Sequence, residues 1–207
     1  MRATLRFAAL MLCLAAVGAG PALSQQQPLP PGPATQAPPP PPVQRGPGTF
    51  SPGELVNEGH RFFGTVSRGL AEVVEKAVGR WGQPNGYILG QEGSGALVVG
   101  LRYGDGKLYT KNAGDRRVFW EGPSIGFDTG GEGARTMMLV YNLPSTDAIY
   151  QRFPGIDGSA YFVGGFGMTA LGDGNIVVVP IRSGVGLRLG ANIGYLKFTP
   201  NATWNPF

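Results

Sequence analysis

Apolar residues alternate with glycine or polar residues through most of the stretch from Val177 to Tyr195. The apolar positions are Val177, Val179, Ile181, Val185, Leu187, Leu189, Ala191, Ile193 and Tyr195. A repeat of two residues is typical of β-strands, whose successive side chains point to opposite faces. The intervening positions include Pro180, Arg182 and several glycines, so we expect antiparallel strands with one buried and one solvated face. Ser183-Gly184 or Gly190 is expected to mark a bend or bulge.

The same period begins upstream, where Leu97, Val99, Leu101 and Tyr103 alternate with Arg102 on the other face. Gly104-Asp105-Gly106 is expected to form a hairpin turn. Further strands are predicted at Lys107–Lys111, Val118–Glu121, Ser124–Asp128, Ala134–Tyr141 and Ser159–Leu171. Of the 35 glycines, 30 follow residue 48. Many short, glycine-rich strands predict a mainly β fold, a small antiparallel barrel whose closure removes exposed edges.

Helical signals occur at two places. Ser51-Pro52-Gly53-Glu54 is a capping box with Pro at the first helical position. Apolar residues then recur at three- and four-residue spacings from Leu55 to Val78, which predicts one amphipathic helix that ends at Gly79 or Gly82. A second, short helix is expected over Ser145–Phe153.

Residues 1–24 resemble a secretory signal peptide. Arg2 and Arg6 precede an apolar stretch, Phe7–Ala19, and Ala22-Leu23-Ser24 supplies the small residues of a cleavage site. The apolar stretch is shorter than the roughly 20 residues that span a bilayer as a helix. We therefore expect export with cleavage of this segment.

Residues 25–48 are rich in Pro, which removes backbone donors and favours extended polyproline II. This segment is predicted to be a disordered linker. The expected organisation is thus a signal peptide (1–24), a Pro-rich linker (25–48) and one folded domain (49–207).

Composition excludes several kinds of site. The chain holds one His and one Cys, so it contains neither a metal site built from several such ligands nor an intrachain disulfide. Removal of Arg2 and Arg6 with the signal peptide lowers the formal charge from +4 by two. Such a weak field does not favour nucleic acid as a partner. No cofactor and no metal are expected.

Two sequence motifs associated with catalysis are present, but the partner residues and the secondary structure that each would need are missing. Gly122-Pro123-Ser124-Ile125-Gly126 fits a nucleophile elbow, but His60, the single His, precedes it and belongs to the predicted helix. Gly165–Ala170 fits a dinucleotide fingerprint yet lies in strand-like sequence. For His60 we expect a capping or packing role. The carboxylates of Glu121, Asp128 and Glu132 remain a candidate acid pair for a hydrolase.

Three segments rich in glycine and aromatic residues are distinctive: Phe119–Gly131, Tyr161–Gly167 and Gly184–Leu196. With the signal peptide and the Pro-rich segment, they make the chain similar to the EipA family of alphaproteobacterial envelope-integrity proteins over roughly Ser51 to Pro200. The resemblance implies a small soluble periplasmic β-barrel that is needed for a sound envelope and is related in architecture to the lipid-binding SYLF domain. It supplies no catalytic residues.

The leading hypothesis is a non-catalytic periplasmic barrel that binds a lipid, another apolar envelope component or a protein partner. Small barrels are either filled by side chains or hold a ligand, and the sequence leaves both open. The aromatic residues predicted to line a cavity, if there is one, are Trp120, Phe127, Phe162, Phe166 and Tyr195. One alternative is an outer-membrane barrel ending at Phe207, although Asn201, Thr203 and Asn205 do not suit its lipid-facing positions. The other is the hydrolase.

Overall fold

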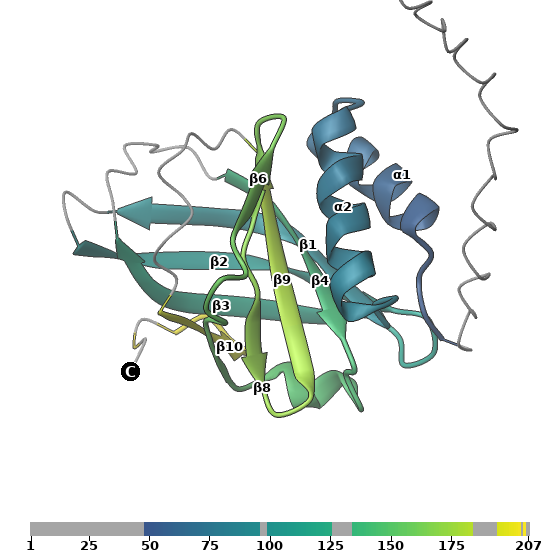
Figure 1. Cartoon of the computed structure of the whole chain (residues 1–207). Helices are drawn as coiled ribbons and strands as arrows, with labels where there is room; N and C mark the ends of the chain where they lie inside the picture. Colours follow the sequence, from purple (N-terminus) through teal and green to yellow (C-terminus); the bar gives the residue numbers. More distant parts are fainter. Residues whose placement is uncertain (1–47, 96–98, 126–133, 184–193, 204, 206–207) are drawn as a thin grey trace, which may run out of the picture. The chain divides into compact units, whose positions relative to one another are not determined.

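A ten-stranded antiparallel sheet curls on itself, and two helices pack on its outer side (Figure 1). This computed structural model describes residues 48–95, 99–125, 134–183, 194–203 and 205. The predicted signal peptide and the Pro-rich linker lie outside the described residues, apart from Gly48. Within them, no helix is both long and apolar enough to cross a membrane.

The helices are α1 (Pro52–Phe63) and α2 (Arg68–Trp81). The strands are β1 (Gly86–Gly95), β2 (Val99–Thr110), β3 (Arg116–Ile125), β4 (Ala134–Tyr141), β5 (Arg152–Pro154), β6 (Tyr161–Val163), β7 (Phe166–Met168), β8 (Leu171–Asp173), β9 (Ile176–Ser183) and β10 (Tyr195–Thr199). Their order in the sheet is β5-β10-β3-β2-β1-β4-β9-β7-β6, and β8 pairs with β9 on a branch from this path.

The curl brings the β5 end of the sheet back to β8. An antiparallel bridge joins Gly155 to Leu171, and the Ile156 amide donates to the Ala170 carbonyl at 2.9 Å. Because β8 also pairs with β9, the sheet meets itself at this end. The predicted small antiparallel β-barrel is confirmed as a curled, barrel-like sheet.

Side chains alternate between two cores, one on each face of the sheet. On the inner face, Met138 and Val140 of β4 join a cluster that includes Ile88, Leu108, Val118, Trp120, Phe153, Val178, Leu196 and Phe198. On the outer face, Met137, Leu139 and Tyr141 pack against the apolar side of α2. The central strands are therefore buried on both faces.

This double burial corrects the expectation of a solvated strand face. In β9, Val179 and Ile181 share a buried face, as predicted, and this face is the helix side. Pro180 and Arg182 on the opposite face are buried as well. The reason is that the sheet curls on itself, so the second face of each strand lines the interior of the curl. Residues 184–193 of the alternating stretch lie outside the described residues.

The predicted long helix is two helices. Gly64 has a φ of 73°, the left-handed conformation that ends α1, and its amide donates to the His60 carbonyl. The His60 ring then bridges the break, with Nε2 3.2 Å from both the amide nitrogen and the carbonyl oxygen of Ser67. The break folds α2 beside α1, so that both helices bury apolar surface.

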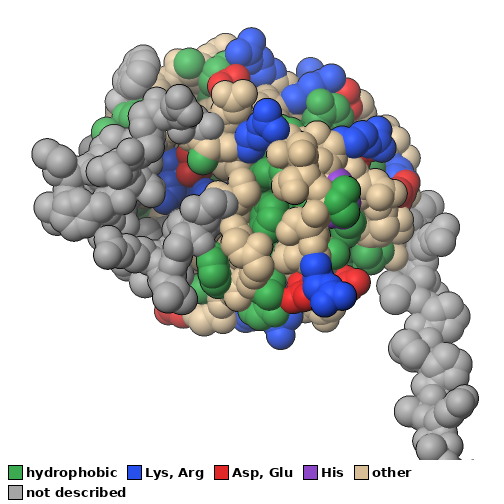
Figure 2. Space-filling view, turned by 90° about the horizontal axis from the view of Figure 1, so that it is seen from above, with side chains coloured by type: hydrophobic (Ala, Val, Ile, Leu, Met, Phe, Trp, Pro, Cys, Tyr) green, Lys and Arg blue, Asp and Glu red, His purple; other side chains and the backbone are tan. Residues whose placement is uncertain are grey.

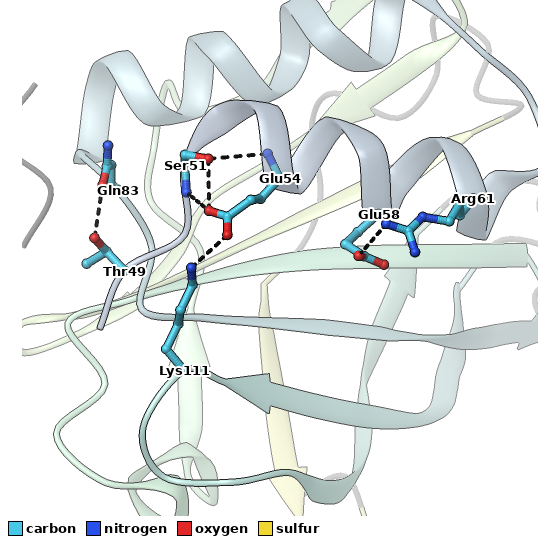
Figure 3. Close-up of polar contacts among 7 residues, drawn as sticks. All are labelled: Thr49, Ser51, Glu54, Glu58, Arg61, Gln83 and Lys111. Atoms are coloured by element: carbon cyan, nitrogen blue, oxygen red, sulfur yellow. Dashed lines mark hydrogen bonds and ion pairs between the residues drawn. The ribbon is translucent and has the colours of Figure 1, made fainter. Parts of the chain in front are cut away.

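The start of α1 forms as predicted and is tied to the sheet (Figure 3). The Ser51 hydroxyl accepts from the Glu54 amide, and the Glu54 carboxylate accepts from the Ser51 amide at 2.7 Å. Lys111, which follows β2, donates to the same carboxylate at 2.7 Å. The capping box thereby fixes the helix end against the β2–β3 turn.

Several strand boundaries differ from the predictions, although Ala134–Tyr141 is confirmed as β4. Gly104-Asp105-Gly106 is not a turn, because β2 runs through it. Ser159–Leu171 is not one strand: Gly164 and Gly165, both with positive φ, separate β6 from β7. The short helix expected over Ser145–Phe153 is a 3-10 turn, Thr146–Ile149, followed by β5.

Candidate functional site

A buried ionic cluster lies on the inner face of the sheet. Glu92 of β1 accepts two hydrogen bonds from Arg182 of β9, from Nε and from Nη2, both at 3.0 Å. Arg102 of β2 places its Nε 3.1 Å from Glu92 Oε1. All three residues are 6% exposed or less. The cluster links β1 to its neighbour β2 and, across β4, to β9.

Trp120 of β3 joins this cluster to the apolar interior. Its indole Nε1 donates to Glu92 Oε2 at 2.9 Å, while its ring packs near Phe198 with centroids 6.2 Å apart. Glu92 thus accepts hydrogen bonds from β3 and β9 and forms an ion pair with Arg102 of β2.

The environment of Glu92 favours the ionised carboxylate. Burial acts to raise the pKa of Glu92, but the charges of Arg182 and Arg102, with the hydrogen bonds from Arg182 and Trp120, outweigh it and lower the pKa below its usual value. A carboxylate held ionised and occupied by donors is a structural ion pair rather than a proton carrier at neutral pH.

A pocket of about 350 Å³ opens on the other face of β1, β2, β3 and β10. Its floor is built from two cross-strand rows: Gly93, Tyr103 and Glu121 form one, and Gln91, Asp105, Phe119 and Thr199 form the other. Ala202 and Thr203, which follow β10, line it from the side. The pocket combines two aromatic rings with carboxylate, amide and hydroxyl groups.

Glu121 is a buried charged residue of this pocket, at 2% exposure. Its Oε1 accepts from the Thr203 hydroxyl at 2.8 Å and lies 3.4 Å from Lys197 Nζ. Its Oε2 is buried and has no hydrogen-bond partner among the described residues. A buried acceptor without a donor is energetically unfavourable, so a bound group that donates to this oxygen would be stabilising.

The other charged residues of the surface are dispersed. Figure 2 shows Lys and Arg side chains scattered over one face, several with acidic atoms beside them. Exposed ion pairs join Lys107 to Asp115 and Arg61 to Glu58. Within the part of the chain that the structure describes, no three His, Cys, Asp or Glu side chains gather as a metal site would require.

The aromatic residues predicted to line a cavity are not brought together. Trp120 belongs to the inner core and is also among the residues that border the pocket of about 350 Å³. Phe166 lies on the helix side, with its ring centroid 5.2 Å from that of Phe63. Phe162 is 40% exposed, and Tyr195 is half-buried under the guanidinium of Arg152. Phe127 lies outside the described residues.

Of the three carboxylates proposed as an acid pair, Glu121 lies in the pocket, while Asp128 and Glu132 lie outside the described residues. Ser124 belongs to β3, so the Gly122–Gly126 motif begins inside a strand. The expected packing role of His60 agrees with its contacts to Ser67 across the helix break.

The local sequence pattern did not predict the pairing of Glu92 with Arg182, or Tyr103 and Phe119 as walls of the pocket. One signal was present, since Arg102 and Arg182 both occupy the non-apolar positions of alternating stretches. When the sheet curls, this face becomes internal, and charged residues on it are expected to form ion pairs with other buried residues.

Comparison with known proteins agrees with this fold. A crystal structure of a β-barrel-like, uncharacterized protein from Brucella abortus is 58% identical, with a TM-score of 0.72, over 77% of this chain and 99% of the other. No curated protein matches the chain. The profile of the envelope integrity protein A family matches residues 48–207, which comprise the whole of the folded domain. The chain therefore belongs to the envelope integrity protein A family.

Proposed function

We propose that this protein is a non-catalytic periplasmic protein that supports the cell envelope by binding a component with an apolar part, a lipid being the first candidate. The family implies a role in envelope integrity. The signal-peptide-like residues 1–24 support export, and the pocket on the outer face of β1, β2, β3 and β10 supports binding.

The pocket is the observation that carries this proposal. On the inner face, the interior is occupied by side chains such as Trp120, Phe153 and Phe198, which are 1% exposed or less. On the outer face, Tyr103 and Phe119 are only half-buried and border a space of about 350 Å³. Partly exposed aromatic rings beside a few polar groups are typical of ligand sites.

Gly93 provides a way to fill this pocket without disturbing the core. It is exposed, lies opposite Tyr103 in the β1–β2 pair, and has open space where a β-carbon would lie. Gly93→Phe would place a ring in the pocket. We expect a deletion strain that carries this variant to remain as sensitive to detergent and cell-wall antibiotics as the uncomplemented deletion strain.

Gly79→Phe is the matched control, because Gly79 is also exposed with open space, but on α2 away from the pocket. It should restore resistance as wild type does, and both variants should show wild-type abundance. Full rescue by Gly93→Phe would refute the pocket as the functional site.

The ligand can be sought directly. Native mass spectrometry of protein purified from its own periplasm should show an adduct on wild type that is absent from Gly93→Phe. The released molecule should be chemically unmodified, as expected for a binding protein. Ligand-free wild type that also binds no extracted envelope lipid would contradict the lipid proposal.

Export is tested separately. Mature protein should be released by osmotic shock, and its N-terminal sequence should begin near Gln25. Retention of residues 1–24, or recovery only with membranes after a carbonate wash, would contradict the proposed location.

A further inference from the structure

We infer that the pocket on the outer face binds its ligand through a cationic ammonium group held at Glu121. This inference rests on the proposed function, which needs only that the pocket binds something, and it specifies the ligand chemistry. It is carried by the charges of the lining, by the unoccupied oxygen of Glu121 and by the rings beside that residue.

The lining is acidic. Among the described residues that border the pocket are Glu92, Asp105 and Glu121, with no Lys or Arg. Glu92 is compensated from the inner face by Arg182, and Asp105 lies 3.4 Å from Arg117 Nη2 at the surface. The basic partners of these carboxylates, including Lys197 beside Glu121, are not among the described residues that border the pocket. The pocket surface therefore presents carboxylates, which favours a positive charge.

Glu121 offers a defined acceptor. Thr203 and Lys197 both approach Oε1, whereas Oε2 has no donor among the described residues. Lys197 Nζ also donates to the Asn205 carbonyl at 2.8 Å, which directs it along the C-terminal segment. An ammonium group carries three donors and forms charge-assisted bonds to carboxylates, so it would supply the donor that Oε2 lacks.

The residues that follow β10 lie beside Glu121 at the pocket. Ala202 and Thr203 are exposed and line the pocket, and Thr203 covers Glu121 through its hydroxyl. Strand pairing does not hold these two residues, since β10 ends at Thr199.

The rings complete the site. Tyr103 is directly opposite Glu121 in the β2–β3 pair, and Phe119 lies two residues before Glu121 on the same face of β3. The face of an aromatic ring attracts a cation electrostatically, most strongly where water is excluded. An alkylammonium ligand would thus place its charge at Glu121 and its chain along Tyr103 and Phe119.

Three probes with the same apolar chain test this inference: hexylammonium, hexan-1-ol and hexanoate, titrated against 15N-labelled folded protein by NMR. We expect hexylammonium to shift the amides of Tyr103, Phe119 and Glu121 and to bind about tenfold more tightly than hexan-1-ol, as one charge-assisted hydrogen bond would give. Hexanoate should bind most weakly. Equal binding of the alcohol and the ammonium, or preference for hexanoate, would overturn the inference while leaving the pocket intact.

Glu121→Gln removes the charge and keeps the shape. It should reduce hexylammonium affinity to that of hexan-1-ol and leave the affinity for hexan-1-ol unchanged. Asp115→Asn, which removes an exposed carboxylate paired with Lys107 outside the pocket, should change neither. An unchanged preference for the ammonium in Glu121→Gln refutes the role of Glu121.

Phe119→Leu serves as a second test if Glu121→Gln does not fold. It should weaken hexylammonium binding several-fold more than hexan-1-ol binding, because only the cation gains from the ring face. An equal loss for both probes would contradict the cationic site. Failure of all three probes to bind wild type would instead contradict the proposed pocket.

Discussion

The indole of Trp120 lies against the α-carbon of Gly104, in the space where a β-carbon would otherwise lie. The two residues are directly opposite each other in the β2–β3 pair. Gly104 therefore provides room for the largest side chain of the inner core, whose Nε1 in turn binds Glu92. The contact connects the apolar interior to the ionic cluster.

Gly104→Ala should destabilise the protein by about 1–3 kcal/mol, the usual range for an overpacked core. The added methyl group would meet three atoms of the indole ring and force Trp120 away from Glu92. Urea unfolding followed by circular dichroism measures the loss. Gly93→Ala is the control, since nothing lies near its β-carbon position, and it should be neutral within about 0.5 kcal/mol.

A double variant tests the cause. Replacing Trp120 by Phe in the Gly104→Ala background should recover part of the lost stability, because the smaller ring leaves space for the methyl group. Additive losses in the double-mutant cycle would show that the two residues do not interact as described.

Gly104 also shows why strand boundaries were hard to predict. The Gly-Asp-Gly sequence carries the local signature of a turn, and nothing near it in the sequence reveals that Trp120 and the backbone of Leu89 occupy the space beside Gly104 and Gly106. Glycine that permits close approach and glycine that permits a turn are identical in sequence. By contrast, the capping box at Ser51 and Glu54 was predictable because its determinants are three residues apart.

Glu92→Gln should cost about 3–5 kcal/mol, because it leaves two buried guanidinium groups without their carboxylate. The free energy of unfolding in urea measures this loss. Asp115→Asn at the exposed pair with Lys107 should cost about 1 kcal/mol or less. Similar losses in the two variants would mean that the inner cluster is not a buried ion pair.

The same carboxylate should make stability depend on pH. The pKa of Glu92 is lowered in the folded state, so its contribution is complete above its unfolded pKa of about 4.3 and is lost as pH falls through the folded value. The difference in unfolding free energy between wild type and Glu92→Gln should therefore be constant between pH 7 and 6 and shrink below about pH 4.

Glu54, whose pKa is lowered to about 2 by hydrogen bonds from Lys111 and Ser51, titrates in both proteins, so its effect cancels in this difference. A difference that stays constant down to pH 3 would show that Glu92 is not the titrating group.

The pocket was less predictable than the sheet for a geometric reason. The row from Gly93 through Tyr103 to Glu121 depends on the registers of two strand pairs. The predicted turn at residues 104–106 would have ended the strand after Tyr103. In the structure, the strand continues to Thr110 and the chain turns between Thr110 and Arg116. Correct alternation therefore identifies which residues share a face, but long-range pairing decides which of them meet.

Tyr141→Phe should leave stability unchanged or raise it by about 1 kcal/mol. The Tyr141 hydroxyl is buried against α2 without a hydrogen-bond partner among the described residues, and burial raises the pKa of this phenol. Removing an unsatisfied polar atom while keeping the ring, which packs on Trp81, eliminates a desolvation cost.

Tyr150→Phe is the matched comparison. The Tyr150 hydroxyl donates to the Arg117 carbonyl at 3.0 Å, so this variant should lose up to about 1 kcal/mol of unfolding free energy. Thermal and urea unfolding of both variants would decide the matter, and a clear loss in Tyr141→Phe would mean that the hydroxyl has a partner after all.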